Sequence, residues 1–366
     1  MKMKKVGILT MNGNHNYGNR LQNYALQEVL NKRGYQTETI VIPRLKHVNE
    51  RKLYKRVFRI VKNPIRYINR QTKNTQSVKT LKEKKITPFT DKYLNTKTIK
   101  LSQKKQLNSN YDFFIVGSDQ VWNPNFYGKD STNFLDFADQ RKRVAYAASF
   151  GVSSIEEEFK DFYKRNLSKI DKISVRENSG QNIIKDLLGQ NVPVVLDPTM
   201  LLSKEEWLDL ASSEVSQTEF EDAYILVYTL RGVSKEIDEK IKEYAQNNNL
   251  KIVCIMGDIY QENALIPTVL EFIDLINKAR FVFTDSFHGT VFSILLETAF
   301  VTLQRDGGNM ESRLLTLLNK FEFTDNYFYN DIDIEKLFNQ MSFEHVLPIL
   351  NQEKDQAFQF LNDSLS

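Results

Sequence analysis

Cysteine is the scarcest residue of this chain, and long hydrophobic runs are missing altogether. The single cysteine, Cys254, cannot form an internal disulfide, which favours a reducing compartment. Nowhere does the sequence offer the roughly 20 uncharged apolar residues that a bilayer-spanning helix needs. The N-terminus carries the positive charge of a signal peptide, but only the short apolar run 6–10 follows it before a polar loop. We therefore expect a cytoplasmic protein.

Several sequence motifs of enzyme chemistry are missing as well. Only four histidines occur, and no two of them stand at the spacing of metal ligands. The chain has no Gly-x-Ser-x-Gly elbow of a serine hydrolase and no Gly-Lys-Ser/Thr of a phosphate-binding loop. The loop 11–19 contains two glycines but no third, so it does not match the dinucleotide fingerprint. We expect neither a metal ion nor a bound cofactor.

Charge is distributed unevenly along the chain. The segment 44–85 contains fifteen Lys or Arg and two acidic residues, a net charge of +13, whereas the whole chain carries +4. Within it, 53–62 can form a helix with apolar side chains on one side and basic ones largely opposite. Such a segment fits an anionic partner: nucleic acid, anionic lipid or a sugar on a lipid diphosphate. A surface helix that packs on its own lobe explains the pattern at least as well.

Hydrophobic periodicity predicts alternating strands and helices. In the first part of the chain, strand patterns occupy 5–10, 37–42, 113–116, 143–147, 172–175 and 193–196. Helical patterns occupy 18–33, where Gly34 supplies the stop, and 178–188. The opening strand, helix and strand predict a parallel sheet with a right-handed crossover. Pro198 biases the residue before it away from helix, and we expect the domain boundary shortly after it.

The second part of the chain repeats this alternation. Strands are expected at 223–228, 251–255, 281–283 and 300–303, and helices at 235–246, 269–278, 289–296 and 311–320. A last helical stretch, 334–361, can pack back across the first lobe. We therefore predict an α/β fold of two Rossmann-like lobes facing a central cleft, with ligands at the carboxyl ends of the strands. The expected parts are an N-terminal lobe over 1–200 with a basic insert at about 44–88, a C-terminal lobe over 201–330 and a helical tail over 331–366.

The segment 281–290 sets a polar corner directly after an apolar strand. Asp285, Ser286 and His288 form the corner, and Gly289 and Thr290 open the helix that follows. Exposed N–H groups and the helix dipole at such a corner favour an anion, and an imidazole there can donate or accept a proton. A helix-capping corner with a structural histidine is an equally good interpretation of the pattern.

Two further loops bear groups that suit a sugar. The loop 11–19 faces the ligand crevice in a doubly wound fold, although His15 itself is expected to be a solvated loop residue. The segment 116–124 brings amides, a carboxylate and an indole together. Ordinary turns, with the indole in the core, explain both segments as well. The candidate acceptor-binding residues are Asn16, Tyr17, Asn19, Asp119, Gln120 and Trp122.

Arginines are the candidate ligands of an anion in the cleft. Arg176 ends the strand pattern 172–175, and its planar fork suits a carboxylate or a phosphate. A surface ion pair with Glu177 would explain Arg176 as well. Arg305 and Arg313 follow the strand pattern 300–303, within reach of the same cleft. The candidate donor-binding residues are Ser286, Gly289, Thr290, Arg305 and Arg313.

Six segments, in this order, resemble the polysaccharide pyruvyl transferase family. Each is weak alone, whereas six in register over roughly 6–315 are specific. The segments are 16–22 (NYGNRLQ), 114–124 (FIVGSDQVWNP), 145–151 (AYAASFG), 174–177 (SVRE), 196–199 (LDPT) and 284–290 (TDSFHGT).

This resemblance implies a glycosyltransferase-B-like fold, phosphoenolpyruvate as the donor, and an acceptor sugar of a surface-polysaccharide precursor such as one for capsule. Two hydroxyls of that sugar end as a cyclic pyruvate ketal. The implied catalytic residues are His288, an acid/base group near the enol ether, and Arg176, which holds the donor's carboxylate or phosphate. No cofactor and no nucleic-acid partner are implied. Some members carry a lysine in the loop after the histidine helix, where this sequence has Arg305.

Two other classes of protein share part of this pattern. A nucleotide-sugar-dependent glycosyltransferase would have the same fold and cleft but would bind a nucleoside diphosphate. A non-catalytic sugar- or membrane-binding protein would use the basic segment without the histidine. The segment 44–85 further predicts a peripheral contact at the inner membrane face, where a lipid-linked acceptor would be carried.

Overall fold

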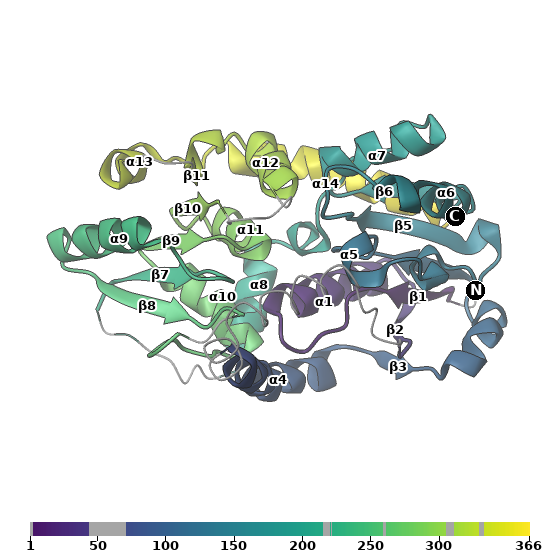
Figure 1. Cartoon of the computed structure of the whole chain (residues 1–366), viewed down its shortest axis with the longest axis horizontal. Helices are drawn as coiled ribbons and strands as arrows, with labels where there is room; N and C mark the ends of the chain where they lie inside the picture. Colours follow the sequence, from purple (N-terminus) through teal and green to yellow (C-terminus); the bar gives the residue numbers. More distant parts are fainter. Residues whose placement is uncertain are drawn as a thin grey trace, which may run out of the picture.

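The computed structural model describes residues 3–43, 71–214, 220, 222–258, 261–304, 311–328 and 333–366. Within these residues the chain forms two α/β lobes, each built around a parallel sheet, and the lobes lie side by side (Figure 1). Arg305, the amphipathic segment 53–62 and most of the basic insert lie outside the described residues.

The first lobe contains a six-stranded sheet in the order β3-β2-β1-β4-β5-β6, with every neighbouring pair parallel. Its central strands are apolar and buried, as expected where helices cover both faces of a parallel sheet. The strands are β1 (Lys5–Leu9), β2 (Gln36–Val41), β3 (Thr96–Thr98), β4 (Phe113–Val116), β5 (Arg143–Ala148) and β6 (Lys172–Val175).

The strand predicted at 193–196 does not form. Val194 makes only an isolated parallel bridge to Val175, at the edge of the sheet. Pro193 has no N–H to donate, so only two backbone hydrogen bonds form here. The Val175 N–H donates to Pro193 O, and the Val195 N–H donates to Val175 O. Pro198 then turns the chain into a 3₁₀ turn at Pro198–Leu201.

The second lobe contains a five-stranded sheet in the order β11-β10-β9-β7-β8, again parallel throughout. Runs of four or five mostly apolar residues form four of its strands, close to the predicted positions, whereas the two-residue strand β11 was not predicted. The strands are β7 (Tyr224–Tyr228), β8 (Lys251–Ile255), β9 (Phe281–Thr284), β10 (Phe300–Leu303) and β11 (Tyr327–Phe328).

Helices cover the faces of both sheets and link the lobes. In the N-terminal half they are α1 (Tyr17–Lys32), α4 (Gln71–Tyr93), α5 (Pro124–Tyr127), α6 (Glu157–Leu167), α7 (Asn178–Leu188) and α8 (Lys204–Ser212). In the C-terminal half they are α9 (Lys235–Asn247), α10 (Val269–Lys278), α11 (Phe287–Leu295), α12 (Glu311–Lys320), α13 (Ile334–Gln340) and α14 (Val346–Ser364). The 3₁₀ helices are η1 (Leu101–Ser109), η2 (Ser131–Phe134), η3 (Gln140–Lys142), η4 (Pro198–Leu201) and η5 (Thr324–Asn326).

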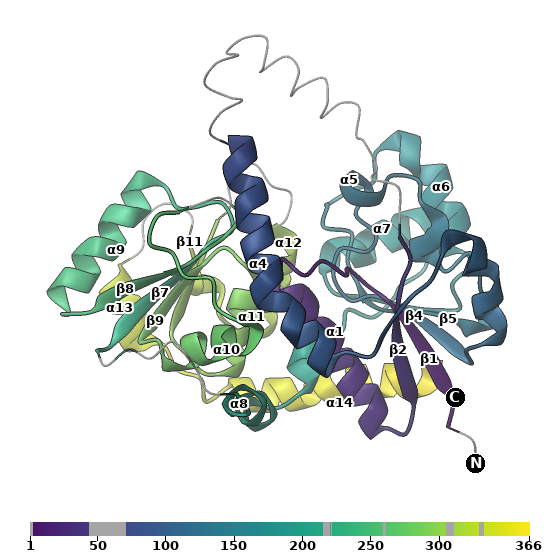
Figure 2. The same ribbon diagram turned by 90° about the horizontal axis from the view of Figure 1, so that it is seen from below.

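The last helical stretch is broken into two helices, whereas the sequence predicts one over 334–361. The break places Pro348 in the first turn of α14, where its missing N–H costs nothing. As predicted, α14 packs back across the first lobe (Figure 2). Lys4 Nζ donates to Leu365 O at 3.1 Å, and the Arg33 guanidinium lies 4.1 Å from the Phe358 ring centroid.

Helix α4 runs between the two lobes (Figure 2) and packs against both α1 and α10. On the first lobe, Thr90 Oγ1 donates to Asn14 Oδ1 at 2.8 Å. On the second, the buried Lys82 donates from Nζ to Gly257 O at 3.1 Å. The basic insert thus ends in a helix that joins the lobes, and this helix continues through Pro88 to Tyr93.

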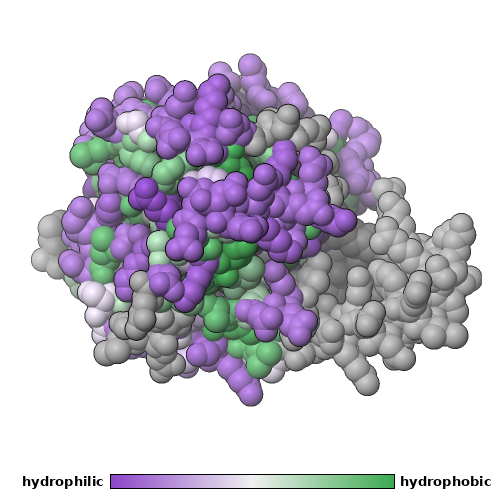
Figure 3. Space-filling model, turned by 90° about the vertical axis from the view of Figure 1, so that its left-hand side faces the viewer, coloured by the Kyte–Doolittle hydropathy of each residue, from purple (hydrophilic) through white to green (hydrophobic). Residues whose placement is uncertain are grey.

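A continuous hydrophobic core also crosses from one lobe to the other. Tyr17 at the start of α1 stacks on Phe272 of α10 with ring centroids 4.7 Å apart, and its hydroxyl donates to Pro267 O at 3.0 Å. On the outside, hydrophilic side chains predominate among the coloured residues of the face shown in Figure 3, with hydrophobic patches between them. None of the helices that the structure describes is long and apolar enough to cross a bilayer.

Candidate functional site

The corner between β9 and α11 is built by its own side chains. Thr284 Oγ1 donates to Tyr228 O at 2.7 Å, and Ser286 Oγ caps α11 by accepting from the Gly289 N–H at 3.3 Å. A Cβ at Gly289 would overlap Thr284, so only glycine fits. Thr290 is fully buried, and its hydroxyl contacts Ser286 O and Thr302 Oγ1. Ser286 thus caps the helix, and Gly289 and Thr290 pack within the corner. All three stay predicted donor ligands.

This corner places His288 at the contact between the lobes. The imidazole packs so closely against Gly18 of α1 that a Cβ there would overlap the ring. Its Nε2 lies 3.7 Å from Asp197 Oδ1, an ion-pair distance that is too long for a hydrogen bond. Nε2 is buried and makes no hydrogen bond within the part of the chain that the structure describes. His288 is thus held in place with one ring nitrogen left for another partner.

Asp197 lies between His288 and Arg176. Arg176 Nη1 donates to Asp197 Oδ2 at 2.6 Å, and Ser118 Oγ donates to the same oxygen at 2.9 Å. Thr199 Oγ1 donates to Oδ1 at 2.7 Å. Burial by itself would raise the pKa of this carboxyl, but His288 and Arg176 hold it far below its ordinary value. Asp197 is therefore a permanent negative charge next to the histidine.

Asp119 and Arg313 complete the group across the lobe contact. Asp119 Oδ1 accepts from Arg176 Nη2 at 3.0 Å and lies 3.6 Å from Arg313 Nη1, which comes from α12 of the second lobe. Despite its burial, the pKa of Asp119 is lowered by Arg176, His288 and Arg313. We call Asp119, Arg176, Asp197, His288 and Arg313 the charge cluster.

Arg176 does not form the surface ion pair with Glu177 that was one interpretation of the sequence. Its side chain is 1% exposed and faces two carboxylates. Burial by itself would lower the pKa of the guanidinium, but the two carboxylates outweigh this effect and raise it. Glu177 instead accepts bonds at Oε1 from Ser149 Oγ (2.8 Å) and the Phe150 N–H (3.0 Å). The guanidinium also lies 4.2 Å from the Phe287 ring centroid.

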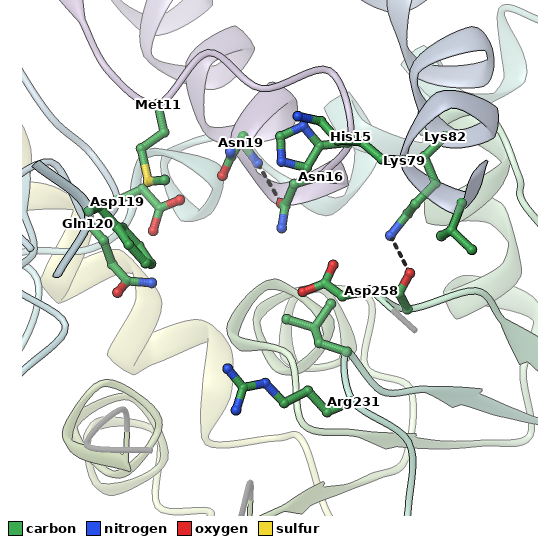
Figure 4. Close-up of a pocket in the computed structure, with 14 residues that line it drawn as sticks. Met11, His15, Asn16, Asn19, Lys79, Lys82, Asp119, Gln120, Arg231 and Asp258 are labelled. Carbon is green, nitrogen blue, oxygen red and sulfur yellow. Dashed lines mark hydrogen bonds between the residues drawn. The ribbon is translucent and has the colours of Figure 1, made fainter. Parts of the chain in front are cut away.

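A pocket of about 430 Å³ opens beside the charge cluster, between the lobes and α4 (Figure 4). This volume suits a small ligand. Asp119 belongs to both the pocket wall and the charge cluster. The lining residues are Met11, His15, Asn16, Asn19, Val78, Lys79, Lys82, Asp119, Gln120, Phe126, Leu230, Arg231, Gly257 and Asp258.

Four of the six candidate acceptor residues line this pocket: Asn16, Asn19, Asp119 and Gln120. Tyr17 and Trp122 do not. Tyr17 is buried at the lobe contact described above. Trp122 is 1% exposed, stacks on Phe134 and donates from Nε1 to Asn133 O at 3.0 Å, so it fills the core of the first lobe.

The pocket also contains residues that the sequence analysis missed. Phe126, seven positions after Asp119 and part of α5, is 42% exposed and supplies the pocket's aromatic surface. Lys79, Arg231 and Asp258 come from α4 and from the loops after β7 and β8. His15, expected to be a solvated loop residue, lies on the wall beside Asn16 and Asn19 (Figure 4). No sequence pattern brings these segments together, because the pocket depends on how the lobes and α4 dock.

Charges of both signs line the pocket. Burial lowers the pKa of Lys82, and Asp258 partly offsets this effect. The side chains of Lys79, Arg231 and Asp258 are exposed around the opening. Among the residues that the structure describes, no group of three or more His, Cys, Asp or Glu could hold a metal ion. The arrangement suits proton transfer and anion binding by side chains.

Comparisons with known proteins agree with this architecture. In solved structures, UDP-GlcNAc 2-epimerase from Methanocaldococcus jannaschii, in complex with UDP-GlcNAc and UDP, is 14% identical with a TM-score of 0.50. The match covers 98% of this chain and 99% of that one. UDP-GlcNAc 2-epimerase from Neisseria meningitidis, bound to UDP-GlcNAc, is 11% identical with a TM-score of 0.48, over 97% and 94% of the two chains. At this level of identity the likeness concerns the fold alone, which is glycosyltransferase-B-like as predicted.

The sequence comparisons bear on the family. A search of curated proteins gives no match. A family model described as polysaccharide pyruvyl transferase matches residues 16–307, which include α1, the charge cluster up to His288, and most of both sheets. Because this match covers most of the chain, the protein belongs to the polysaccharide pyruvyl transferase family and is a transferase.

Proposed function

We propose that this protein transfers a pyruvyl group from phosphoenolpyruvate to a sugar of a surface-polysaccharide precursor and leaves it as a cyclic ketal. The observation that supports this proposal is the charge cluster at the edge of the pocket. An imidazole and two guanidinium groups meet there at the lobe contact. A donor with a carboxylate and a phosphate needs cations, and the carbon–carbon double bond of its enol phosphate needs a proton donor.

In the proposed reaction, His288 protonates the methylene carbon of the donor, which makes the neighbouring carbon electrophilic. One sugar hydroxyl adds to that carbon, the bond to the phosphate oxygen breaks, and the second hydroxyl closes the ring. One hydroxyl proton balances the new methyl C–H bond, and the other leaves with phosphate or solvent. Asp197 Oδ1 lies 3.7 Å from Nε2 of His288, on the wall of the same site.

The donor's carboxylate is assigned to the space between Arg176 and Arg313. Asp119 Oδ1 lies in this space, 3.0 Å from Nη2 of Arg176 and 3.6 Å from Nη1 of Arg313. A donor anion would therefore compete with Asp119 for these cations. Arg305 stays a predicted donor ligand. It is the only Lys or Arg in the sequence between α11 and α12.

The acceptor sugar is assigned to the pocket, where Asn16, Asn19, Asp119 and Gln120 offer hydrogen-bonding groups.

We further propose that this sugar is lipid-linked and that the segment 44–85 contacts the anionic inner face of the membrane. Within the described part of this segment, Lys84 and Lys85 of α4 are exposed. Vesicle co-sedimentation tests the contact: replacing Lys55, Arg56, Arg59 and Lys62 by Gln should release the protein from anionic vesicles. Equal binding by both proteins would rule it out.

Thermal-shift measurements test the donor. A ligand that binds only the native state raises the unfolding temperature. Phosphoenolpyruvate should raise it, whereas UDP-sugars should not. If UDP-sugars stabilise the protein and phosphoenolpyruvate does not, the protein is a nucleotide-sugar-dependent glycosyltransferase of the same fold.

A further inference from the structure

We propose that His15 is a second proton-transfer residue, which accepts the proton of the acceptor hydroxyl as its oxygen attacks the donor. This role rests on the proposed function, because it assigns the base of the same reaction. His15 precedes α1 in a loop that the family resemblance covers only from Asn16 onward.

The imidazole of His15 is held on the wall of the pocket. Gly13 packs against the ring so closely that a Cβ at position 13 would overlap it. The next residue, Asn16, caps α1 by accepting from the Asn19 N–H at 3.1 Å, which fixes the loop where it meets the helix. Figure 4 shows the ring beside Asn16 and Asn19. The side chain is thus positioned for a ligand without being folded into the core.

One ring nitrogen of His15 is unsatisfied. Nδ1 is buried and makes no hydrogen bond to any residue that the structure describes. Buried polar atoms usually have a partner, and an exception calls for an explanation. A ligand or a water molecule in the pocket would explain this one. The asparagines beside the ring can orient a hydroxyl, but an amide cannot accept its proton.

His15 and His288 both lie near the N-terminal end of α1. His288 packs against Gly18. Three peptide units separate Gly18 from His15, so the Cα atoms of Gly18 and His15 are at most about 11 Å apart. Asp119 borders the pocket and also belongs to the charge cluster. A sugar in the pocket can therefore present a hydroxyl to His15 and reach a donor held beside His288.

The surroundings of His15 favour its neutral form. Burial lowers its pKa below the ordinary value of 6.5, and Lys79 lowers it further. Lys82 of α4 acts in the same direction, whereas Glu83 of α4 and Asp258 after β8 partly offset these effects. The imidazole is therefore available as a base at neutral pH.

The proton count of the reaction calls for such a base. His288 gives a proton to the methylene carbon when the first hydroxyl adds, and the proton of that hydroxyl must leave at the same stage. With His15 as its acceptor, the first addition makes one C–O bond and one C–H bond, breaks the O–H bond, and leaves His15 protonated and His288 neutral. Exchange with solvent restores both for the next cycle.

Phosphate release from phosphoenolpyruvate tests this role, with nitrophenyl glycosides as acceptors and with water alone as the attacking group. For His15→Ala we expect kcat to fall about a hundredfold, the usual scale for a lost base. KM for phosphoenolpyruvate should stay nearly unchanged, and the acidic limb of the wild-type pH profile should disappear. Added imidazole should restore part of the rate, an effect that a merely structural role would not produce.

The matched control is His345→Gln, because His345 contacts Phe321 O in the second lobe, away from the pocket. This variant should keep the wild-type rate and pH profile. If the wild type is active and the His15→Ala variant is equally active, the role of His15 is overturned but the proposed function is not. The same holds if the variant keeps the acidic limb of the pH profile. A wild type that consumes no phosphoenolpyruvate with glycosides or water would overturn the proposed function and, with it, the role that depends on it.

Discussion

The charge cluster and the pocket beside it share Asp119 but differ in how their polar groups are satisfied. In the charge cluster, carboxylates and guanidinium groups are largely buried and pair with one another. In the pocket, Lys79, Arg231 and Asp258 are exposed, and Nδ1 of His15 has no hydrogen-bond partner among the described residues. Paired buried charges fix geometry, whereas open polar groups leave room for an exchangeable ligand. The fixed part suits the chemistry, and the open part suits recognition of the sugar.

Breaking the charge cluster should have the largest effect on stability. Asp197→Asn keeps the shape of the side chain but removes the charge that Arg176 faces at 2.6 Å. Removing one partner of a buried ion pair typically costs about 3–5 kcal/mol, because the other charge stays buried. We expect a loss of this size in the free energy of unfolding, measured in urea. Asp363→Asn on the exposed end of α14 is the control and should change little.

The same variant should change the response to acid. The folded pKa values of Asp119 and Asp197 lie below their unfolded values. Stabilisation by such carboxyls is complete above the unfolded pKa and fades as pH falls, from about pH 5 downward. The gap between wild type and Asp197→Asn should therefore narrow between about pH 5 and pH 3. A constant gap over this range would show that the charge of Asp197 contributes little to stability.

Two aromatic residues near the pocket should behave in opposite ways. Trp122 is buried in the core, so Trp122→Ala should cost about 3–5 kcal/mol of unfolding free energy. Phe126 is 42% exposed on the pocket wall. Phe126→Ala should cost less than about 1 kcal/mol but weaken the use of a glycoside acceptor. Denaturation curves for both variants check the first effect, and KM for the glycoside checks the second. Similar losses of stability would contradict the placement of the two rings.

His288 belongs to the charge cluster but should affect turnover more than stability. His288→Gln should lower kcat by about two orders of magnitude, the scale expected for a lost acid/base group. The unfolding midpoint should change little, since Nε2 makes no hydrogen bond within the described residues. Phosphate release and a melting curve on the same sample measure both quantities. A fully active His288→Gln variant would show that another group supplies the proton.

The fold was largely predictable because it follows from local patterns. Apolar runs and helical periodicity gave the bounds of β4, β6, β8, β10, α7, α10 and α12 as observed. The sequence analysis did not predict β3, β11, α6 or α8. Two of its predicted elements fail where a proline decides. Pro193 prevents a strand, and Pro348 marks the start of a new helix. In both cases the apolar pattern continues while the hydrogen bonding does not.

The site was predictable only in part, because its geometry depends on pairs of distant residues. His288 and Arg176 follow strands, so their positions at the lobe contact could be predicted. That Arg176 would face two carboxylates could not, since Asp119 and Asp197 come from other segments. The pocket was harder still. Its walls include α4, whose docking on the second lobe through Lys82 leaves no signal in a single sequence.

The central claim is that phosphoenolpyruvate binds at the charge cluster and not in the open pocket. Calorimetric titration of phosphoenolpyruvate into wild type, Arg176→Lys and Phe126→Ala tests it most directly, with circular dichroism to show that each variant is folded. Arg176 uses two nitrogens toward two carboxylates, which lysine cannot do. The account predicts that each wild-type chain binds one donor molecule. Affinity for the donor should be at least about tenfold weaker in Arg176→Lys, a loss of about 1.4 kcal/mol or more in binding free energy. In Phe126→Ala the affinity should be unchanged. Absence of binding to the wild type, or a loss in Phe126→Ala without one in Arg176→Lys, would contradict it.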